Sequence, residues 1–184
     1  MEHFYQNIDG FFDFQDLYSS AVQTFADGAH FVEVGAWKGT SAAYMAVEII
    51  NSGKIIKFDA VDTWLGSVEH MSGQFADQDA IEGRLYETFL SNTEPVKHVI
   101  NPIRLSSVEA SKLYNDNSLD FVFIDADHRY EAVKADIAAW SPKLKIGGFL
   151  GGHDYWWGDV NRAVNEAFGT PEIHRSSWMV RRLF

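Results

Sequence analysis

The sequence predicts a doubly wound α/β fold, with an open and largely parallel sheet covered by helices on both faces. Segments with apolar residues at helical spacing alternate along the chain with short runs rich in Val, Ile and Phe. This alternation is typical of parallel α/β sheets. A turn with two glycines also joins the first such run to the following helix, at the position where these sheets bind ligands.

The first half of the chain contains a β-turn-α-β unit after an N-terminal helix. Its predicted elements are a helix between Asp13 and Gly28, a strand over 29–34, a turn over 35–39, a helix over 41–50 and a strand over 54–61. Asp13 is expected to cap the first helix, since Asp is favoured there. The segment 63–92 breaks the alternation with a loop over 66–73 and an added helix over 78–90. Because insertions at strand ends often carry function, we expect it near the active site.

The second half continues the alternation up to a terminal hairpin. Its predicted elements are strands over 96–105, 119–124 and 149–151, helices over 108–114, 130–140 and 160–168, and a hairpin of 172–174 with 178–183. The strand over 119–124 is an almost unbroken apolar run, so both of its faces are expected to be buried. Gly147 and Gly148 are expected to lead into the next strand.

Composition and charge exclude several classes of protein. The 184 residues are 46% hydrophobic and 22% charged, which fits one packed domain over 1–184 with an N-terminal helical segment over 1–28. The net charge of -11 opposes nucleic acid, and zero Cys excludes thiolate metal sites. No apolar run reaches the roughly 20 residues that span a bilayer, and the N-terminus lacks a signal-peptide pattern. We therefore expect a cytoplasmic enzyme and leave its oligomeric state open.

The turn after the first strand is the first candidate ligand site. Gly35 and Gly39 allow close backbone approach to a ligand, although two glycines also simply make a βα turn. A dinucleotide fingerprint would need glycine where Trp37 and Thr40 stand, which disfavours a nicotinamide-dependent oxidoreductase. A P-loop would need its lysine after the second glycine. Glu33, two residues before the turn, suits a positively charged ligand.

A carboxylate at the end of the second strand is the second candidate. Asp62 follows Gly39 by 23 positions, where it is placed to accept both hydroxyls of a ribose. Asp59 competes for this assignment, but it lies inside the strand with the opposite pointing parity. We therefore expect Asp62 rather than Asp59 to bind the ligand.

These motifs together resemble those of the class I S-adenosylmethionine-dependent methyltransferases. Within that class the chain is similar to the group labelled methyltransferase domain 24, over nearly its whole length. The motifs are Glu-x-Gly-x-x-x-Gly over 33–39, a strand that ends in Asp62, Leu119-Asp-Phe-Val-Phe-Ile-Asp-Ala-Asp-His-Arg-Tyr130, and Gly147-Gly-Phe-Leu-Gly-Gly-His-Asp-Tyr155. The resemblance implies a Rossmann-like sheet of seven strands with an antiparallel last strand.

The resemblance also implies S-adenosylmethionine as the cofactor. The turn over 35–39 would surround its methionine portion, Glu33 would lie near its amine, Asp62 would bind the ribose, and Ser107 with its neighbours would border the adenine. Trp37 departs from the pattern, because many relatives carry Gly there. The detailed geometry of the turn is therefore expected to differ.

Acidic and imidazole side chains follow the fourth and fifth strands, at Asp125, Asp127, His128, His153 and Asp154. Adjacent strands lie about 5 Å apart, so these groups can converge over the cofactor's methyl group. Similar metal-dependent O-methyltransferases carry an acid and an Asp-Asn pair here, which implies Mg, Mn or Zn on Asp125, His153 and Asp154.

Other interpretations of these side chains stay open. His128 or His153, beside Asp125, would serve as general base on the acceptor. Asp127 and His128 would alternatively only cap the helix that begins near Tyr130.

The expected function is methyl transfer to an oxygen or nitrogen of a small molecule or sugar, with or without a metal. The alternatives are a nicotinamide-dependent oxidoreductase and a non-catalytic module that binds S-adenosylmethionine. Trp64 and the segment Tyr155-Trp-Trp157 follow strand ends, where their rings could hold an apolar or aromatic acceptor. Burial against helices is the ordinary alternative for each Trp. The remaining histidines, His70 among them, are expected to be surface or core residues.

Overall fold

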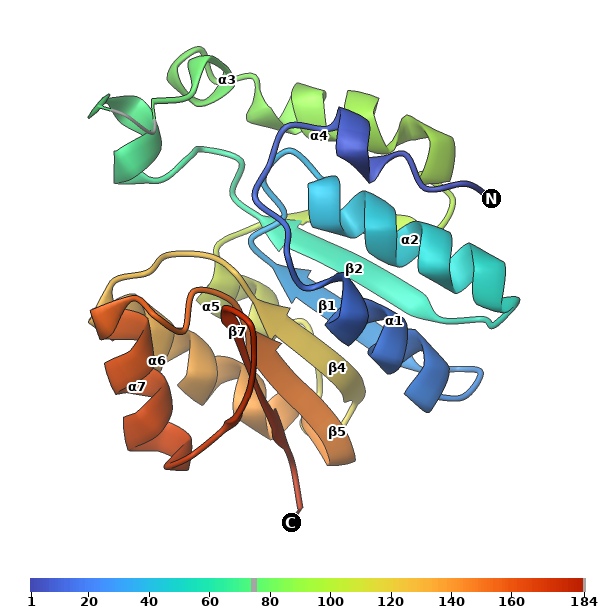
Figure 1. Ribbon diagram of the computed structural model, residues 1–184, viewed down its shortest axis with the longest axis vertical. Coiled ribbons are helices and arrows are strands. Elements are labelled where there is room, and N and C mark those ends of the chain that lie inside the picture. The colour runs from blue at the N-terminus through green and yellow to red at the C-terminus, as the bar shows by residue number, and fades with distance from the viewer. Residues whose placement is uncertain (74–75, 184) are drawn as a thin grey trace.

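The computed structural model describes residues 1–73 and 76–183, and a seven-stranded sheet forms its centre (Figure 1). The strands are β1 (His30–Val34), β2 (Lys57–Asp62), β3 (Ile100–Arg104), β4 (Leu119–Ile124), β5 (Leu144–Gly152), β6 (Glu172–His174) and β7 (Ser177–Arg181). Their order is β3-β2-β1-β4-β5-β7-β6. The first five strands pair in parallel, and β7 runs antiparallel to both of its neighbours. The predicted doubly wound sheet with an antiparallel last strand is confirmed.

Helices cover both faces of the sheet (Figure 1). The α-helices are α1 (Gln15–Thr24), α2 (Thr40–Ser52), α3 (Gln78–Ile81), α4 (Leu85–Thr93), α5 (Ser107–Ser111), α6 (Tyr130–Trp140) and α7 (Gly158–Phe168). Short 3-10 helices are η1 (Tyr5–Asn7), η2 (Val68–Met71), η4 (Glu94–Val96) and η5 (Ser141–Lys143). The first core cluster joins α1, α2 and α4 to one face, and the second joins α5, α6 and α7 to the other.

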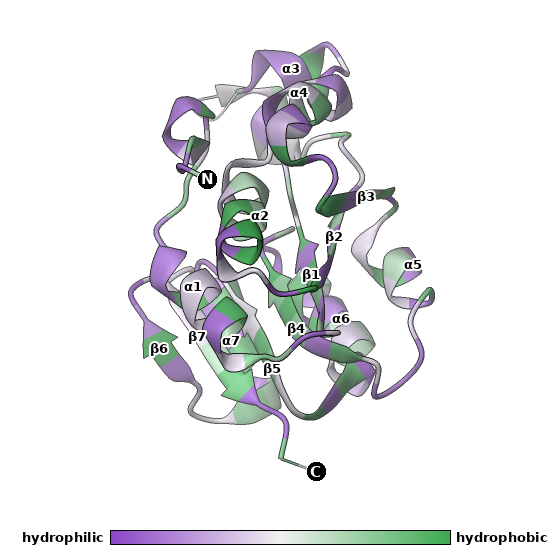
Figure 2. Cartoon of the chain, turned by 90° about the vertical axis from the view of Figure 1, so that its right-hand side faces the viewer, coloured by the Kyte–Doolittle hydropathy of each residue, from purple (hydrophilic) through white to green (hydrophobic). Residues whose placement is uncertain are grey.

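The apolar run of β4 explains why the sheet is covered on both sides. Phe121 and Phe123 belong to the first core cluster, whereas Val122 and Ile124 belong to the second. Alternate side chains of a strand point to opposite faces, so β4 is buried from both sides, as predicted. Figure 2 shows hydrophobic colour concentrated in the central strands and in α2.

Three predicted boundaries are wrong for reasons that lie in backbone conformation. The single helix predicted over 78–90 is two helices, separated at Gly83 with φ +69. The loop predicted over 66–73 contains η2, and residues 74–75 of the insertion lie outside the described part. Gly147 and Gly148 do not precede β5 but lie within it, where Gly147 has φ +88 and the pairing with β4 shifts register. A glycine inside a strand commonly marks such an irregularity.

Two further elements are shorter than predicted. The strand predicted over 96–105 begins only at Ile100, because residues 94–96 form a 3-10 helix that contains a proline. The helix predicted over 108–114 ends at Ser111. Among the residues that the structure describes, none of the helices has the length and apolar character needed to cross a membrane.

The predicted N-terminal cap of α1 is also wrong. Phe14 occupies the cap position of α1 and makes no side-chain cap bond. The Asp13 carboxylate instead contacts His153 at 2.9 Å and accepts a hydrogen bond from Ser176 at 2.5 Å. Asp13 therefore ties the N-terminal segment to the end of β5.

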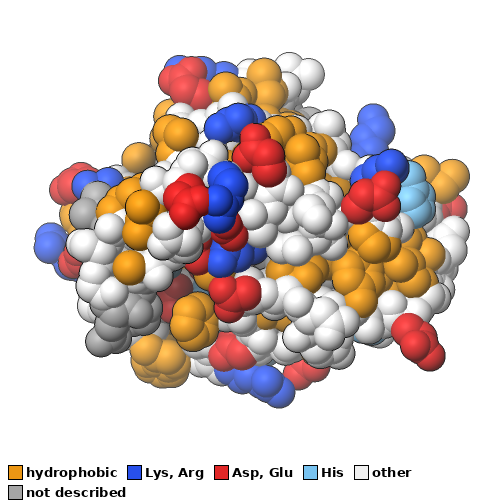
Figure 3. Space-filling model, turned by 90° about the horizontal axis from the view of Figure 1, so that it is seen from above, with side chains coloured by type: hydrophobic (Ala, Val, Ile, Leu, Met, Phe, Trp, Pro, Cys, Tyr) orange, Lys and Arg blue, Asp and Glu red, His pale blue; other side chains and the backbone are white. Residues whose placement is uncertain are grey.

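Surface charges of opposite sign are interleaved. On the face seen in Figure 3, Lys and Arg side chains lie beside acidic ones, with hydrophobic side chains in patches between them. Three exposed ion pairs in the described part of the chain join residues one helical turn apart, such as Lys97 with Glu94 at 2.6 Å. Exposed pairs of this kind add little to stability.

Candidate functional site

The carboxyl ends of β1, β2, β4 and β5 open into a cleft of about 630 Å³. Clefts of about 300–1,000 Å³ are typical of sites for small organic ligands and cofactors. Two other parts of the chain complete its walls, namely the N-terminal residues Asp9 to Phe11 and the insertion between Gly66 and Asp77. The cleft lies where a doubly wound sheet is expected to bind ligands.

Close packing explains both glycines of the first turn. Gly35 has φ +95, and a Cβ atom there would lie 1.9 Å from the carbonyl oxygen of Asp125. Gly39 has φ +90, and a Cβ atom there would lie 2.7 Å from the Thr93 side chain. Neither position accepts a larger residue without displacement of its neighbours. The turn therefore passes close to the end of β4 and lines the cleft.

Trp37 gives this turn its own geometry. Its backbone has φ +40, which is uncommon for a residue with a side chain. Its amide donates to Asp62 Oδ2 at 2.8 Å, and its carbonyl accepts from Trp64 Nε1 at 2.8 Å. Its ring stacks on His70 of the insertion, with centroids 5.4 Å apart and an interplanar angle of 12°.

His70 is a cleft residue that the sequence analysis missed. It lines the cleft, and Ser67 donates its amide hydrogen to His70 Nδ1 at 3.2 Å. Its partner Trp37 lies 33 positions earlier in the chain. No local sequence pattern could have predicted the contact between Trp37 and His70, because it forms only when the insertion packs against the turn.

Asp62 and Asp59 lie on opposite faces of β2, as the pointing parity predicts. Asp62 lines the cleft, and Asp59 does not. Burial raises the pKa of Asp62, against the effect of the hydrogen bonds from Trp64 and Trp37. Asp59 accepts hydrogen bonds from Asn101 at 2.9 Å and from Tyr114 at 2.7 Å, and pairs with a histidine. Asp59 is therefore a structural carboxylate, whereas Asp62 faces the cleft, and its contact with a ligand stays a prediction.

Glu33 lies behind the turn rather than on the wall of the cleft. Its side chain is 1% exposed, and Oε1 accepts a hydrogen bond from Tyr18 at 2.9 Å. Burial raises the pKa of Glu33 to about 8, against the lowering effect of hydrogen bonds from Ser41 and Tyr18. The expected contact of Glu33 with a cofactor amine stays a prediction.

The buried Glu33 predicts a pH dependence of stability. Its pKa of about 8 in the folded chain lies above the ordinary 4.5. Its contribution is therefore complete below pH 4.5 and is lost as the pH rises through 8. Between about pH 5 and about pH 9, the melting temperature of the natural protein should fall by at least about 4 °C more than that of Glu33→Gln. If the melting temperatures of the two proteins fall equally over this pH range, the raised pKa of Glu33 is contradicted.

Lys38 joins both covering segments to the turn. Its side chain is buried, and Nζ donates to Asp77 Oδ2 at 2.5 Å and to Asp9 Oδ2 at 3.1 Å. Asp77 belongs to the insertion and Asp9 to the N-terminal segment, and both line the cleft. Asn92 also donates to the Lys38 carbonyl at 2.9 Å. One lysine thus holds two walls of the cleft.

Lys38→Met should therefore loosen both walls. We expect stability to fall by about 2 kcal/mol, since the substitution leaves the buried Asp77 carboxylate without its cation. Binding of S-adenosylhomocysteine should weaken by about 10-fold. Lys97→Met removes an exposed pair and is the control, with both quantities expected to stay unchanged. Thermal melts and calorimetric titration measure the two effects, and identical behaviour of the two variants would contradict the role of Lys38.

Ser107 lies on the wall of the cleft beyond the end of β3, and its expected contact with adenine stays a prediction. Its hydroxyl accepts a hydrogen bond from Trp140 Nε1 at 2.9 Å. Leu105 lines the same part of the cleft. This part therefore combines an apolar side chain with a polar one whose orientation is fixed.

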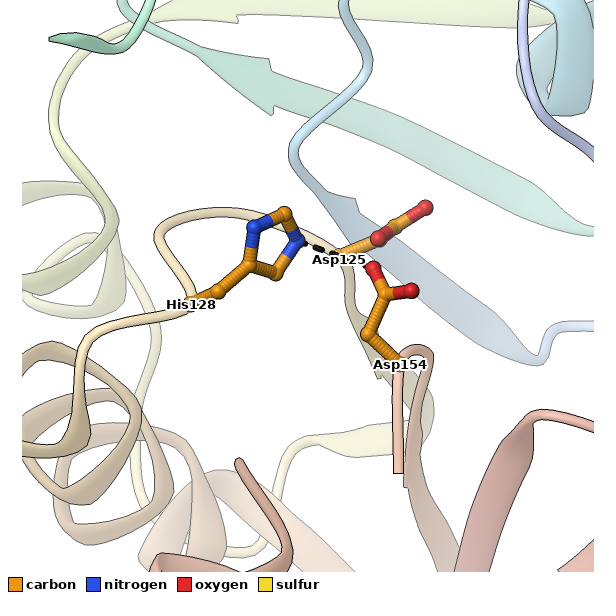
Figure 4. Close-up of side chains that lie close together, drawn as sticks. All are labelled: Asp125, His128 and Asp154. Atoms are coloured by element: carbon orange, nitrogen blue, oxygen red, sulfur yellow. Dashed lines mark ion pairs between the residues drawn. The ribbon is translucent and has the colours of Figure 1, made fainter. Parts of the chain in front are cut away.

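Asp125, His128 and Asp154 converge at the ends of β4 and β5 (Figure 4). Each offers one ligand atom, and these atoms lie within 4.8 Å of one another. His128 Nε2 lies 2.9 Å from Asp154 Oδ2. All three side chains are partly buried and line the cleft. The predicted convergence of the two strand ends is therefore present.

The predicted roles of His153 as base and metal ligand stay predictions, and its surroundings work against them. Its Nε2 faces Asp13 at 2.9 Å and Ser176 at 3.0 Å, and its Nδ1 faces Asp154 at 3.2 Å and Asp125 at 3.6 Å. Burial lowers its pKa, but the surrounding Asp125 and Asp154 carboxylates raise it to about 11, which disfavours proton acceptance. The converging ligand atoms belong to His128, together with Asp125 and Asp154.

The alternative that Asp127 and His128 only cap α6 is wrong. The cap position is Arg129, which makes no side-chain cap bond. Asp127 accepts a hydrogen bond from the Arg129 amide at 2.9 Å and pairs with its guanidinium, which holds the pKa of Asp127 below its usual range. His128 turns toward Asp154.

The aromatic residues after the strand ends divide into buried and exposed ones. Trp64 is 1% exposed and Tyr155 is 8% exposed, so burial is their role. Trp157 is 45% exposed and lines the cleft, with its ring centroid 4.5 Å from that of His128. Phe11, which the sequence did not single out, is 79% exposed and also lines the cleft.

Comparisons with known proteins agree with the fold. A family model described as a methyltransferase domain matches residues 32–155. The uncharacterized protein y4gI of Sinorhizobium fredii (strain NBRC 101917 / NGR234) is 28% identical over 123 residues, which cover 67% of this chain. The match spans only 13% of that relative's own length.

Two solved structures share the fold. The O-methyltransferase NovP has a TM-score of 0.69 and 16% identity, over 92% of this chain and 79% of that one. Aeropyrum pernix fibrillarin with bound S-adenosyl-L-methionine has a TM-score of 0.55 and 15% identity, over 89% of this chain and 72% of that one.

Proposed function

Because the chain belongs to the methyltransferase domain family and has the class I methyltransferase fold, we propose that it transfers the methyl group of S-adenosylmethionine to an oxygen or nitrogen of a small molecule. One observation carries this proposal. The same cleft holds a carboxylate suited to ribose, Asp62, and a pair suited to proton removal, His128 with Asp154. Cofactor and acceptor would therefore share one enclosed space.

In this proposal the cofactor lies along the strand ends. Asp62 accepts the ribose hydroxyls, the turn of Gly35, Trp37 and Gly39 surrounds the methionine portion, and Ser107 borders the adenine. The cofactor carries a sulfonium and an amine, so its net charge is positive. The acidic side chains of the cleft suit that charge.

The proposed chemistry needs one proton acceptor. The acceptor's oxygen or nitrogen attacks the methyl carbon, the carbon–sulfur bond breaks with its electron pair on sulfur, and the acceptor's proton passes to His128. Asp154, 2.9 Å from His128 Nε2, orients the imidazole and stabilises the imidazolium that forms. The hydrogen bonds from His128 and His153 overcome the effect of burial and hold the pKa of Asp154 well below its usual range, so it stays ionised.

The same three side chains fit a divalent cation by number and chemistry. Mg, Mn or Zn held by Asp125, His128 and Asp154 would polarise the acceptor oxygen. His153 works against this, because its positive charge lies 3.2 Å from Asp154 and 3.6 Å from Asp125. We therefore expect methyl transfer to survive chelation with EDTA. Loss of activity in EDTA and its return with added Mn or Mg would instead favour the metal.

Calorimetric titration with S-adenosylhomocysteine tests the core of the proposal. The folded protein should bind it at one site per chain, and NADH should give no heat. A folded protein that binds NADH but not S-adenosylhomocysteine would favour the oxidoreductase alternative. A protein that binds S-adenosylhomocysteine and methylates no acceptor would favour the non-catalytic module.

A further inference from the structure

Two exposed aromatic side chains line the cleft. Phe11 and Trp157 are 79% and 45% exposed. Trp157 contacts His128, which pairs with Asp154, so its ring belongs to the end of the cleft where Asp154 lies. Phe11 belongs to the N-terminal segment that is held between Asp9, which pairs with Lys38, and Asp13, which contacts His153 at 2.9 Å. Exposed large apolar side chains beside a cavity commonly mark a binding surface.

The same cleft is acidic. Within the described ranges 1–73 and 76–183, no Lys or Arg lines it, whereas six carboxylates do: Asp9, Asp62, Asp77, Asp125, Asp127 and Asp154. Lys38 pairs with two of them from behind the wall, and Arg129 pairs with a third. Asp125 and Asp154 face His153, and Asp154 also pairs with His128. An anionic acceptor would meet these carboxylates at short range in a partly enclosed site, where repulsion between like charges is strong.

We infer that the acceptor is a neutral or cationic molecule with a flat apolar ring beside its reacting hydroxyl or amine, held by Phe11 and Trp157 and selected by the acidic lining against anions. This inference rests on the proposed function, because it places the ring next to the transferred methyl group. A ring against Trp157 brings its substituent toward His128, whose ring centroid is 4.5 Å away. Aromatic faces also attract cations, which favours an ammonium group on the acceptor.

Three phenols of nearly equal size test the charge selection. 4-Ethylphenol, tyramine and 4-hydroxyphenylacetate share the ring, the hydroxyl and a para CH2 group, and the rest of that para substituent is a neutral methyl, a cationic aminomethyl or an anionic carboxylate. Each is titrated into protein saturated with S-adenosylhomocysteine, with binding followed by calorimetry. We expect tyramine and 4-ethylphenol to bind, and 4-hydroxyphenylacetate to bind at least about 10-fold more weakly than either.

The outcomes separate the inference from the function on which it rests. Equal or tighter binding of 4-hydroxyphenylacetate overturns the charge selection. If none of the three phenols binds while S-adenosylhomocysteine does, the acceptor class is wrong and the cofactor proposal stands. If the folded protein does not bind S-adenosylhomocysteine, the proposed function fails and the inference fails with it.

Two neighbouring tryptophans provide a matched pair of variants. Trp157→Ala should weaken tyramine binding by about 10-fold or more, and Phe11→Ala should act in the same direction. Trp156 is 67% exposed, donates its indole hydrogen to the Arg175 carbonyl at 2.8 Å, and does not line the cleft. Trp156→Ala should therefore leave tyramine binding unchanged.

Retained affinity for S-adenosylhomocysteine, within about twofold, reports that each variant is folded. If Trp157→Ala has no effect on tyramine, or if Trp156→Ala has an equal one, Trp157 does not hold the acceptor. The phenol series still tests the charge selection in that case.

Discussion

Asp62→Asn is expected to weaken the binding of S-adenosylhomocysteine by about 100-fold, or about 2.7 kcal/mol. Asp62 Oδ2 accepts the Trp37 amide at 2.8 Å, and Oδ1 accepts the Trp64 amide at 2.7 Å. In the proposed complex it also accepts the two ribose hydroxyls. Hydrogen bonds to a charged acceptor contribute about 1.5–3 kcal/mol each. Asn keeps the shape of the side chain but loses the charge and one acceptor oxygen, so only part of this energy disappears.

Asp59→Asn is the matched control on the same strand. Asp59 accepts hydrogen bonds from Asn101 and Tyr114 on the face away from the cleft. Its variant should lose about 1–3 kcal/mol of stability and keep its affinity for S-adenosylhomocysteine within about twofold. Calorimetric titration gives the two affinities, and thermal melts give the two stabilities. An equal loss of affinity in both variants would mean that β2 as a whole, rather than Asp62, determines binding.

The sequence predicts the fold best where a local pattern has only one solution. The almost unbroken apolar run over 119–124 gives β4 its observed bounds, and the apolar spacing over 130–140 gives α6 its observed bounds. Asp62 was distinguished from Asp59 for the same reason, because side chains along a strand alternate between two faces. In each case the deciding information lies within a few residues.

Prediction from the sequence fails where the role of a residue depends on a partner that is distant in the chain. Asp13 has the right residue type and position for a helix cap, but it pairs with His153, 140 positions away in the chain. The Asp125 and Asp154 carboxylates raise the pKa of His153 to about 11, which works against its predicted role as a base. His70 meets Trp37 only after the insertion folds back. A propensity scale contains none of these contacts, because they depend on tertiary structure.

The catalytic proposal makes its largest prediction at Asp154. Asp154→Asn should lower kcat by about 10³-fold, because the amide can neither orient His128 for proton removal nor stabilise the imidazolium that forms. The KM for S-adenosylmethionine should change little, since Asp154 lies at the end of the cleft away from Asp62 in the proposed complex. Steady-state rates with the acceptor identified from the phenol series measure both constants.

Asp127→Asn is the control for Asp154, since Asp127 also lines the cleft but pairs with the exposed Arg129. It should keep kcat within about threefold of the natural protein. If Asp154→Asn also keeps its kcat, proton removal does not limit the reaction, and His128 is not the base. If both variants lose activity equally, the total negative charge of the cleft determines the rate, rather than the pair of His128 with Asp154. The proposed pair of His128 with Asp154 requires a large loss at Asp154 and not at Asp127, because the Asp154 carboxylate lies 2.9 Å from the imidazole whereas Asp127 pairs with Arg129.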